Sequence, residues 1–185
     1  ALPIFSASEI DVRLGATWLP PEDIEQFVHE LLSTAYYIRN RIKVHYSPST
    51  AAWNIENKNA DYNNVAAGVT YGTNRINAYK IIEETLNLKD VRIFDTVTDE
   101  NGNEVRVLNK KDTILAQQKQ QAIKDAFRDW IGKAPDRRDR LTTLYNTKFN
   151  SIRPREYDGS HIRFTGMNPE ITLRPHQVNA IARIL

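Results

Sequence analysis

Basic side chains with an interleaved aromatic residue lie along residues 151–172, a connector that contains Pro and Gly. The residues concerned are Arg153, Arg155, Tyr157, His161 and Arg163. Arginine side chains hold phosphates, and an aromatic ring can stack on a base, so this mixture is typical of nucleic-acid contact. A second interpretation stays open beside the first: the connector is a strap whose arginines pair with Glu156, Asp158 and neighbouring carboxylates.

The charge distribution favours a polyanionic partner for the C-terminal third. Residues 1–127 hold 14 Lys and Arg against 17 Asp and Glu, a net charge of −3, whereas residues 128–185 hold 11 against 6, a net charge of +5. A basic region of this kind suits DNA, although a solvated surface would have the same composition. The predicted DNA-binding residues are Arg137, Arg138, Arg153, Arg155, Tyr157 and Arg163.

The last stretch of the chain begins Leu173-Arg174-Pro175-His176-Gln177. Pro175 fits the first turn of a helix, where its missing N–H costs nothing. Val178, Ile181, Ala182 and Leu185 then recur at helical spacing and give the helix one apolar face. An ordinary amphipathic helix with a solvated Gln would show the same pattern.

Several short stretches, taken in this order, resemble one family. They are Arg13-Leu14-Gly15-Ala16-Thr17-Trp18, Tyr71-Gly72-Thr73-Asn74-Arg75, Tyr145-Asn146, Phe149-Asn150, Arg153-Pro154-Arg155-Glu156-Tyr157-Asp158-Gly159 and Gly166-Met167-Asn168-Pro169. The Leu-Arg-Pro-x-Gln stretch is similar to the one that precedes the phosphate-binding loop of superfamily two helicases. Together, these stretches resemble the helicase–DNA methyltransferase proteins of bacterial mobile elements, phages and plasmids.

The resemblance implies a fragment between a methyltransferase region and a Swi/Snf-like helicase motor, both outside these residues. In the parent protein Gln177 would read adenine with its amide, supported by Arg174 and His176. The parent would use ATP and Mg²⁺ in its motor and S-adenosylmethionine for adenine methylation. For the fragment we expect DNA and the flanking domains as partners. The alternative is a structural linker or protein-interaction domain without DNA binding.

The segment itself lacks the motifs of either enzyme. ATP hydrolysis needs a Gly-Lys-Ser/Thr loop, and no such step occurs in the sequence. A DNA methyltransferase of this kind needs an Asn/Asp-Pro-Pro-aromatic site. The Pro-Pro pair of this chain follows Leu19, and Asn168-Pro169 precedes Glu170, so neither stretch matches that site. We therefore predict a non-catalytic fragment with no cofactor and no metal site. The absence of Cys fits a reducing compartment, and no apolar run could span a membrane, so a cytoplasmic location is expected.

The pattern of apolar residues predicts an α+β fold. Residues 1–109 form a mixed α+β region with helices over 21–34 and 74–87, the second capped by Thr73. Strands over 41–46, 51–55, 91–98 and 104–108 are expected to form one small antiparallel sheet, with Asn101-Gly102 as a hairpin turn. Residues 110–150 form a helical hairpin, in which Asp112 or Thr113 caps the first helix, Pro135 ends it and Asp136 caps the second. Arg137, Arg138 and Arg140 are expected on its outer surface. Residues 151–185 form the basic connector and the C-terminal helix, which the resemblance identifies as the start of the helicase motor with its adenine-reading Gln motif.

Overall fold

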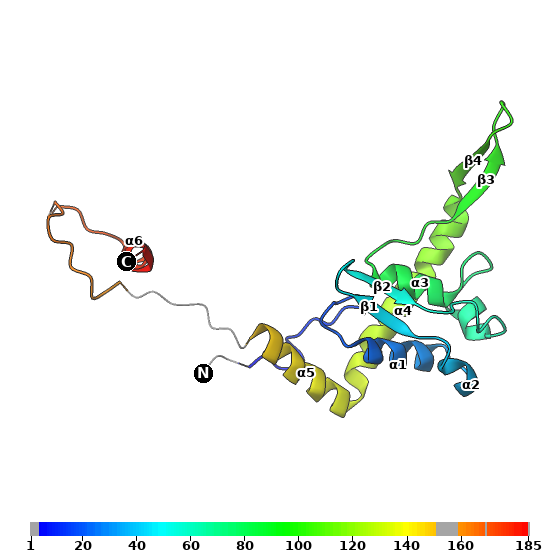
Figure 1. Ribbon diagram of the computed structural model, residues 1–185, viewed down its shortest axis with the longest axis horizontal. Coiled ribbons are helices and arrows are strands. Elements are labelled where there is room, and N and C mark those ends of the chain that lie inside the picture. The colour runs from blue at the N-terminus through cyan, green and yellow to red at the C-terminus, as the bar shows by residue number, and fades with distance from the viewer. Residues whose placement is uncertain (1–3, 151–158, 169, 185) are drawn as a thin grey trace.

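The computed structural model describes residues 4–150, 159–168 and 170–184, and it has an α+β fold (Figure 1). The α+β class and the C-terminal helix predicted from the sequence are confirmed. In chain order the elements are α1 (Pro21–Leu31), α2 (Tyr36–Arg39), β1 (Val44–Ser47), β2 (Ala52–Ile55), the π-helix η1 (Ala66–Thr70), α3 (Ala78–Leu86), β3 (Phe94–Thr98), β4 (Glu104–Leu108), α4 (Lys110–Lys133), α5 (Pro135–Phe149) and α6 (Pro175–Ile184).

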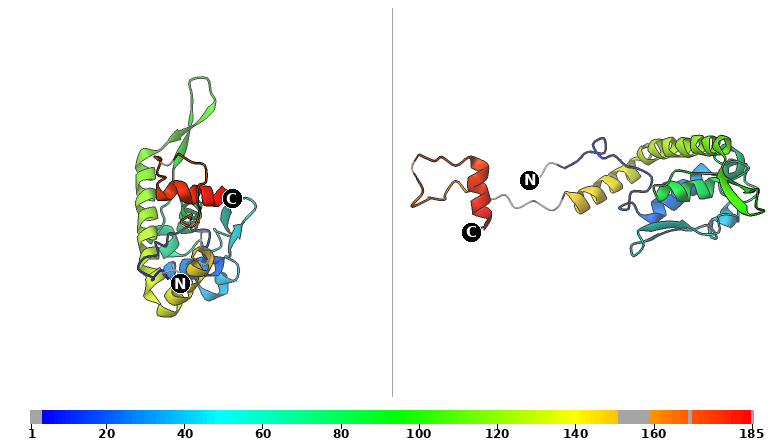
Figure 2. Two further views of the ribbon diagram at one scale, coloured as in Figure 1. Left: turned by 90° about the vertical axis from the view of Figure 1, so that its left-hand side faces the viewer. Right: turned by 90° about the horizontal axis from the view of Figure 1, so that it is seen from above.

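The four strands form two separate antiparallel hairpins, so the prediction of one four-stranded sheet is wrong. β1 pairs with β2 from Val44↔Ile55 to Ser47↔Ala52, and β3 pairs with β4 from Phe94↔Leu108 to Thr98↔Glu104. Figures 1 and 2 show the β3–β4 hairpin projecting from the rest of the fold.

Side chains of α3 explain why β2 accepts no further strand. The Asn87 side chain accepts a hydrogen bond from the Trp53 N–H and donates one to the Trp53 carbonyl, both at 2.9 Å. The Glu83 carboxylate accepts from the Ile55 N–H at 2.8 Å. Because these outward-facing backbone groups of β2 are already bonded to Asn87 and Glu83, the outer edge of β2 is not open for pairing with β3 or β4.

Helices α1, α3, α4 and α5 pack around one hydrophobic core that joins the mixed region to the helical hairpin. Its members include Ile24, Phe27 and Val28 of α1, Ile81 and Ile82 of α3, Ile123 and Phe127 of α4, and Leu141 of α5. The Phe27 and Phe127 rings meet edge to face, 5.0 Å apart. Arg140 of α5 also pairs with the buried Asp23 carboxylate of α1. The long helix α4 therefore contacts α1, α3 and α5 and connects them through the core.

Several helix boundaries differ from those predicted. Helix α1 begins at Pro21 as expected, but it ends before Ser33, whose φ of 48° is incompatible with a continuing helix. Asn77 caps α3 in place of Thr73, and Asn109 caps α4 in place of Asp112 or Thr113. Pro135 opens α5 and Asp136 lies in its first turn, so Asp136 is not the cap. In the two Asn caps an extended residue points its amide oxygen at the first free N–H groups, which is the general geometry of a cap.

Helix α6 begins at Pro175, as predicted. Gly159 packs against its backbone and donates its N–H to Asn179 at 3.0 Å, and a Cβ at this glycine would lie only 2.4 Å from the Val178 carbonyl oxygen. Within the described ranges, no helix combines the length and the apolar character needed to cross a membrane.

Candidate nucleic-acid interface

Arg137 does not lie on an outer surface, which corrects the expectation from the sequence. It is only 9% exposed, and its guanidinium carbon lies 3.4 Å from the centroid of the Trp130 ring. The guanidinium also donates a hydrogen bond to the Trp130 carbonyl, while the Trp130 indole N–H donates to Glu30 of α1. Burial lowers the pKa of Arg137, and the nearby Glu30 opposes that shift. The contacts make Arg137 part of the packing between α4, α5 and α1.

The other predicted DNA-contact residues are exposed or lie outside the described residues. Arg138 is exposed, with its Nε 3.6 Å from Asp139, and Arg163 is exposed in the segment before α6. Arg140 is paired with Asp23. Arg153, Arg155 and Tyr157 fall in the range 151–158, outside the described residues. Of the predicted DNA-contact arginines that the structure describes, Arg138 and Arg163 are therefore exposed and Arg137 is buried.

Arg174, His176 and Gln177 stand together at the start of α6, and all three are exposed. The Gln177 side-chain oxygen accepts a hydrogen bond from the Arg174 N–H at 2.9 Å, and the Gln177 N–H donates to the Arg174 carbonyl. This reciprocal contact resembles a capping box and fixes the first turn of the helix. Within the described ranges, the amide nitrogen of Gln177 makes no hydrogen bond.

A basic groove elsewhere in the fold was not anticipated from the sequence. It has a volume of about 380 Å³ and lies between the loop 57–64, the start of α3 and the base of the β3–β4 hairpin. Its cationic and aromatic lining consists of Lys58, Arg75, Lys80, Arg92, Arg106 and Phe94. We call this cavity the basic groove; no Asp or Glu belongs to its lining.

Asn77 joins two walls of the basic groove. Its side-chain oxygen caps α3 by accepting from the Lys80 N–H at 3.0 Å. Its side-chain nitrogen donates to the Lys58 carbonyl at 3.1 Å and to the Asn59 side chain at 3.3 Å. The positive end of the α3 dipole faces the same groove, which adds to the field of the cations.

Arg75 is held rigidly at the hairpin base. Its guanidinium lies 2.7 Å from the Asp95 carboxylate and 2.9 Å from the Asp112 carboxylate, and it donates to the Phe94 carbonyl at 2.9 Å. The hydrogen bond with Asp95 raises the pKa of Arg75 and lowers the pKa of Asp95. Arg75 thus serves mainly to position the hairpin, and Lys58 is likewise paired, at 2.6 Å, with Glu83.

Three cations of the basic groove keep their charge available. Lys80, Arg92 and Arg106 are exposed, and within the described part of the chain no carboxylate lies within ion-pair distance of any of them. The Arg106 guanidinium lies 4.6 Å from the centroid of the Phe94 ring. An arginine over a half-exposed aromatic ring, beside two further free cations, is a surface suited to phosphates.

Sequence reasoning missed the basic groove because its residues are spread over positions 58–106 and lie in the part of the chain with net negative charge. No spacing rule joins a loop lysine, a helix lysine, an arginine just before β3 and an arginine of β4. The acidic residues of the hairpin serve other roles: Asp99 accepts the N–H groups of Asn101 and Asn103 in the turn. Among residues 4–150, 159–168 and 170–184, no three His, Asp or Glu side chains gather in a way that could hold a metal ion.

Comparison with known proteins places the basic groove inside a recognised domain. The model of a family described as a domain of unknown function, DUF8437, matches residues 13–151. Since this range covers most of the chain, the chain belongs to that family. No curated protein and no solved structure matches it. All residues of the basic groove fall within the matched range, whereas α6 follows it.

Proposed function

We propose that the chain is a non-catalytic DNA-contacting module, and that the basic groove is its principal contact with the phosphate backbone. The observation that carries the proposal is the set of three unpaired cations, Lys80, Arg92 and Arg106, around one cavity with no carboxylate in its lining. The exposed Arg138 and Arg163 are additional candidates for contacts at the periphery.

The free charges set the expected strength of binding. Each phosphate that a cation neutralises releases a condensed counterion, so the logarithm of affinity falls with the logarithm of salt concentration by about 0.9 for each contact on duplex DNA. Three contacts predict a slope of about −2 to −3. Binding by the chain alone should therefore be weak at physiological salt and much tighter at low salt.

The proposed setting is a larger protein in which this module lies between a DNA methyltransferase region and an ATP-driven helicase motor. The sequence resemblance supports this setting, as does the position of Gln177 in the first turn of α6, where a side chain can reach beyond the helix end. ATP, Mg²⁺ and S-adenosylmethionine would then be ligands of the parent protein, and catalysis would belong to its other domains.

A salt titration with matched variants tests the proposal. The test variant carries Lys80→Gln, Arg92→Gln and Arg106→Gln, and DNA binding is followed by fluorescence anisotropy at several salt concentrations. We expect affinity at low salt to fall at least tenfold and the magnitude of the salt slope to decrease by about two to three units. The control variant loses the same charge at exposed sites away from the basic groove, through Lys133→Gln, Lys148→Gln and Arg183→Gln.

Two results would overturn the proposal. One is equal DNA affinity in the test variant and the wild type. The other is an absence of binding by the wild type at low salt, which would favour the alternative function, a structural or protein-interaction domain without DNA contact. Circular dichroism and the thermal midpoint of each variant establish that the three replacements leave the fold intact.

A further inference from the structure

A second cavity lies beside the basic groove and has a different lining. Its volume is about 430 Å³, within the range of small-molecule sites, and it lies between α2 and the loop 57–64. Tyr37 and Tyr62 line it together with Arg41, Asp61 and Asn63. We call this cavity the tyrosine pocket.

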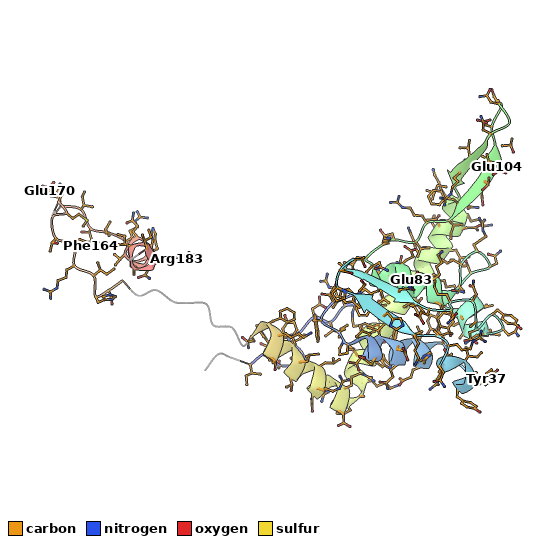
Figure 3. The ribbon with its side chains drawn as sticks, viewed as in Figure 1. Tyr37, Glu83, Glu104, Phe164, Glu170 and Arg183 are labelled. Carbon is orange, nitrogen blue, oxygen red and sulfur yellow. The ribbon has the colours of Figure 1, made fainter. Side chains whose placement is uncertain are left out.

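The two tyrosines are unusually exposed for aromatic residues. Tyr37 is 69% exposed and Tyr62 is 83% exposed, so neither ring belongs to the hydrophobic core. Figure 3 shows Tyr37 projecting from the surface at α2. Exposed aromatic rings beside a cavity offer flat apolar faces for a planar ligand.

The floor of the tyrosine pocket is held in place by buried hydrogen bonds. The Tyr79 hydroxyl donates to the Asp61 carboxylate at 2.7 Å and shares a 2.8 Å hydrogen bond with the Thr34 hydroxyl. The Asn64 side chain donates to the same carboxylate and to the Leu32 carbonyl, each at 2.7 Å. These bonds fix the loop 57–64 against the end of α1, so the pocket is formed before any ligand arrives.

One loop forms a wall of both cavities. Lys58 and Asn59 line the basic groove, and the adjacent residues Ala60 to Asn64 line the tyrosine pocket. The two cavities therefore share this one short loop as a wall. Arg41 adds a cation to the pocket, and no carboxylate within the described part of the chain lies within ion-pair distance of it.

We propose that the tyrosine pocket binds an unstacked base of single-stranded nucleic acid whose phosphates lie in the basic groove. The inference rests on the proposed function and names the form of nucleic acid that the chain prefers. In a duplex the bases are stacked inside the helix, so only a single strand or an unpaired base can reach a tyrosine ring. Asn63, Arg41 and the backbone of the loop supply hydrogen-bonding groups for the base edge and the adjoining phosphate.

Replacement of the tyrosines separates stacking from phosphate contact. The probe is a fluorescently labelled oligothymidylate of about 15 nucleotides, compared with a duplex of the same length. We expect Tyr37→Ala with Tyr62→Ala to weaken single-strand binding by about 5- to 100-fold, and to leave duplex binding within about twofold of the wild type. Tyr37→Phe with Tyr62→Phe should retain single-strand binding, because the phenyl ring still stacks.

Tyr36 provides a matched control. It is 83% exposed and its ring centroid lies 5.9 Å from that of Tyr37, but it does not line the pocket. Tyr36→Ala should therefore bind the single strand like the wild type.

The outcomes of the tyrosine and groove variants are distinguishable. If the Tyr37→Ala, Tyr62→Ala protein binds the single strand like the wild type, or loses affinity for the single strand and the duplex equally, the tyrosine pocket is not a base site. Neither result contradicts phosphate binding in the basic groove. If the Lys80, Arg92 and Arg106 variant described above keeps full affinity for both probes, the proposed function itself is overturned. If the groove variant loses affinity for both probes and the tyrosine variant loses affinity for the single strand alone, both proposals are supported.

Discussion

Gln120 of α4 holds together the segment that brings Arg92 to the basic groove. The side chain is 2% exposed. Its nitrogen donates to the Lys89 carbonyl at 2.8 Å and to the Thr85 hydroxyl at 3.0 Å, and its oxygen accepts from the Val91 N–H at 3.3 Å. Residues 87–93 link α3 to β3, so Gln120 replaces the strand partner that this segment lacks.

Gln120→Leu would fill most of the same volume while removing all three hydrogen bonds. The Val91 N–H is buried and would lose its partner, at a cost of about 1–3 kcal/mol. The Lys89 carbonyl is only partly buried and can bond to water, so its loss should add about 1 kcal/mol. Thr85 keeps its hydrogen bond to the Ile81 carbonyl. We expect the free energy of unfolding to fall by about 2–4 kcal/mol.

Urea denaturation followed by circular dichroism measures this loss. Gln121→Leu is the matched control, because Gln121 is the next residue along α4, is exposed, and bonds only to Asp125 on the same helix face at 3.0 Å. The control should stay within about 0.5 kcal/mol of the wild type. A loss below about 0.5 kcal/mol for Gln120→Leu, or equal losses in both variants, would refute the view that Gln120 anchors this segment.

Two further predictions concern pH and nucleotide. Burial lowers the pKa of His29. The unfolded chain therefore binds the proton more readily, so the stability should fall as pH drops below about 6.5. Urea midpoints measured between about pH 7.5 and pH 5 should decrease less for His29→Met than for the wild type, and equal decreases would contradict this origin. In the proposed parent protein, Gln177→Ala should raise the KM for ATP and reduce the preference for ATP over GTP, because a site built to hydrogen-bond a base rejects analogues that leave its groups unpaired. Steady-state ATPase kinetics with ATP and GTP test this prediction. Unchanged discrimination between the two nucleotides would make Gln177 an ordinary capping residue.

Local signals in the sequence predicted most of the elements. The apolar stripe of Ile24, Phe27 and Val28 predicted α1, and the Asn101-Gly102 pair between alternating segments predicted the β3–β4 hairpin. These signals depend on periodicity and on turn chemistry, which act over a few neighbouring residues. The separation of the two hairpins could not be predicted, because it depends on Asn87 and Glu83 meeting β2 across more than 25 residues of chain.

The candidate site was harder to predict than the fold, and Arg137 shows why. In the sequence it is one of several arginines in a basic region, indistinguishable from Arg138. In the structure it is stacked on Trp130 and buried, whereas Arg138 is exposed. The burial of an arginine depends on which aromatic and carbonyl groups the helix packing brings to it. A charge reversal that included Arg137 would test stability as much as DNA binding.

Segment charge also misleads about where an anion can bind. Residues 1–127 carry a net charge of −3, yet they contain the basic groove. Many of their carboxylates are held in internal contacts: Glu25 pairs with Lys43, Glu83 with Lys58, and Asp95 and Asp112 with Arg75. An anion near the surface responds to the unpaired charges within about 10 Å, the screening length at moderate salt, and not to the sum over the segment.

The small number of free cations has a consequence for the proposed function. Three unpaired charges and one base site give modest affinity, so the chain alone would release DNA readily at physiological salt. Attached to a second DNA-binding domain, the same module would act at a high effective concentration, and the combined affinity could exceed that of either part by a factor of about 10² to 10⁴. A weak contact of this kind suits a module that must hold a strand during each step of a motor and let it go before the next. In the proposed parent protein, the groove variant should therefore affect DNA retention more than the chemistry of any catalytic domain.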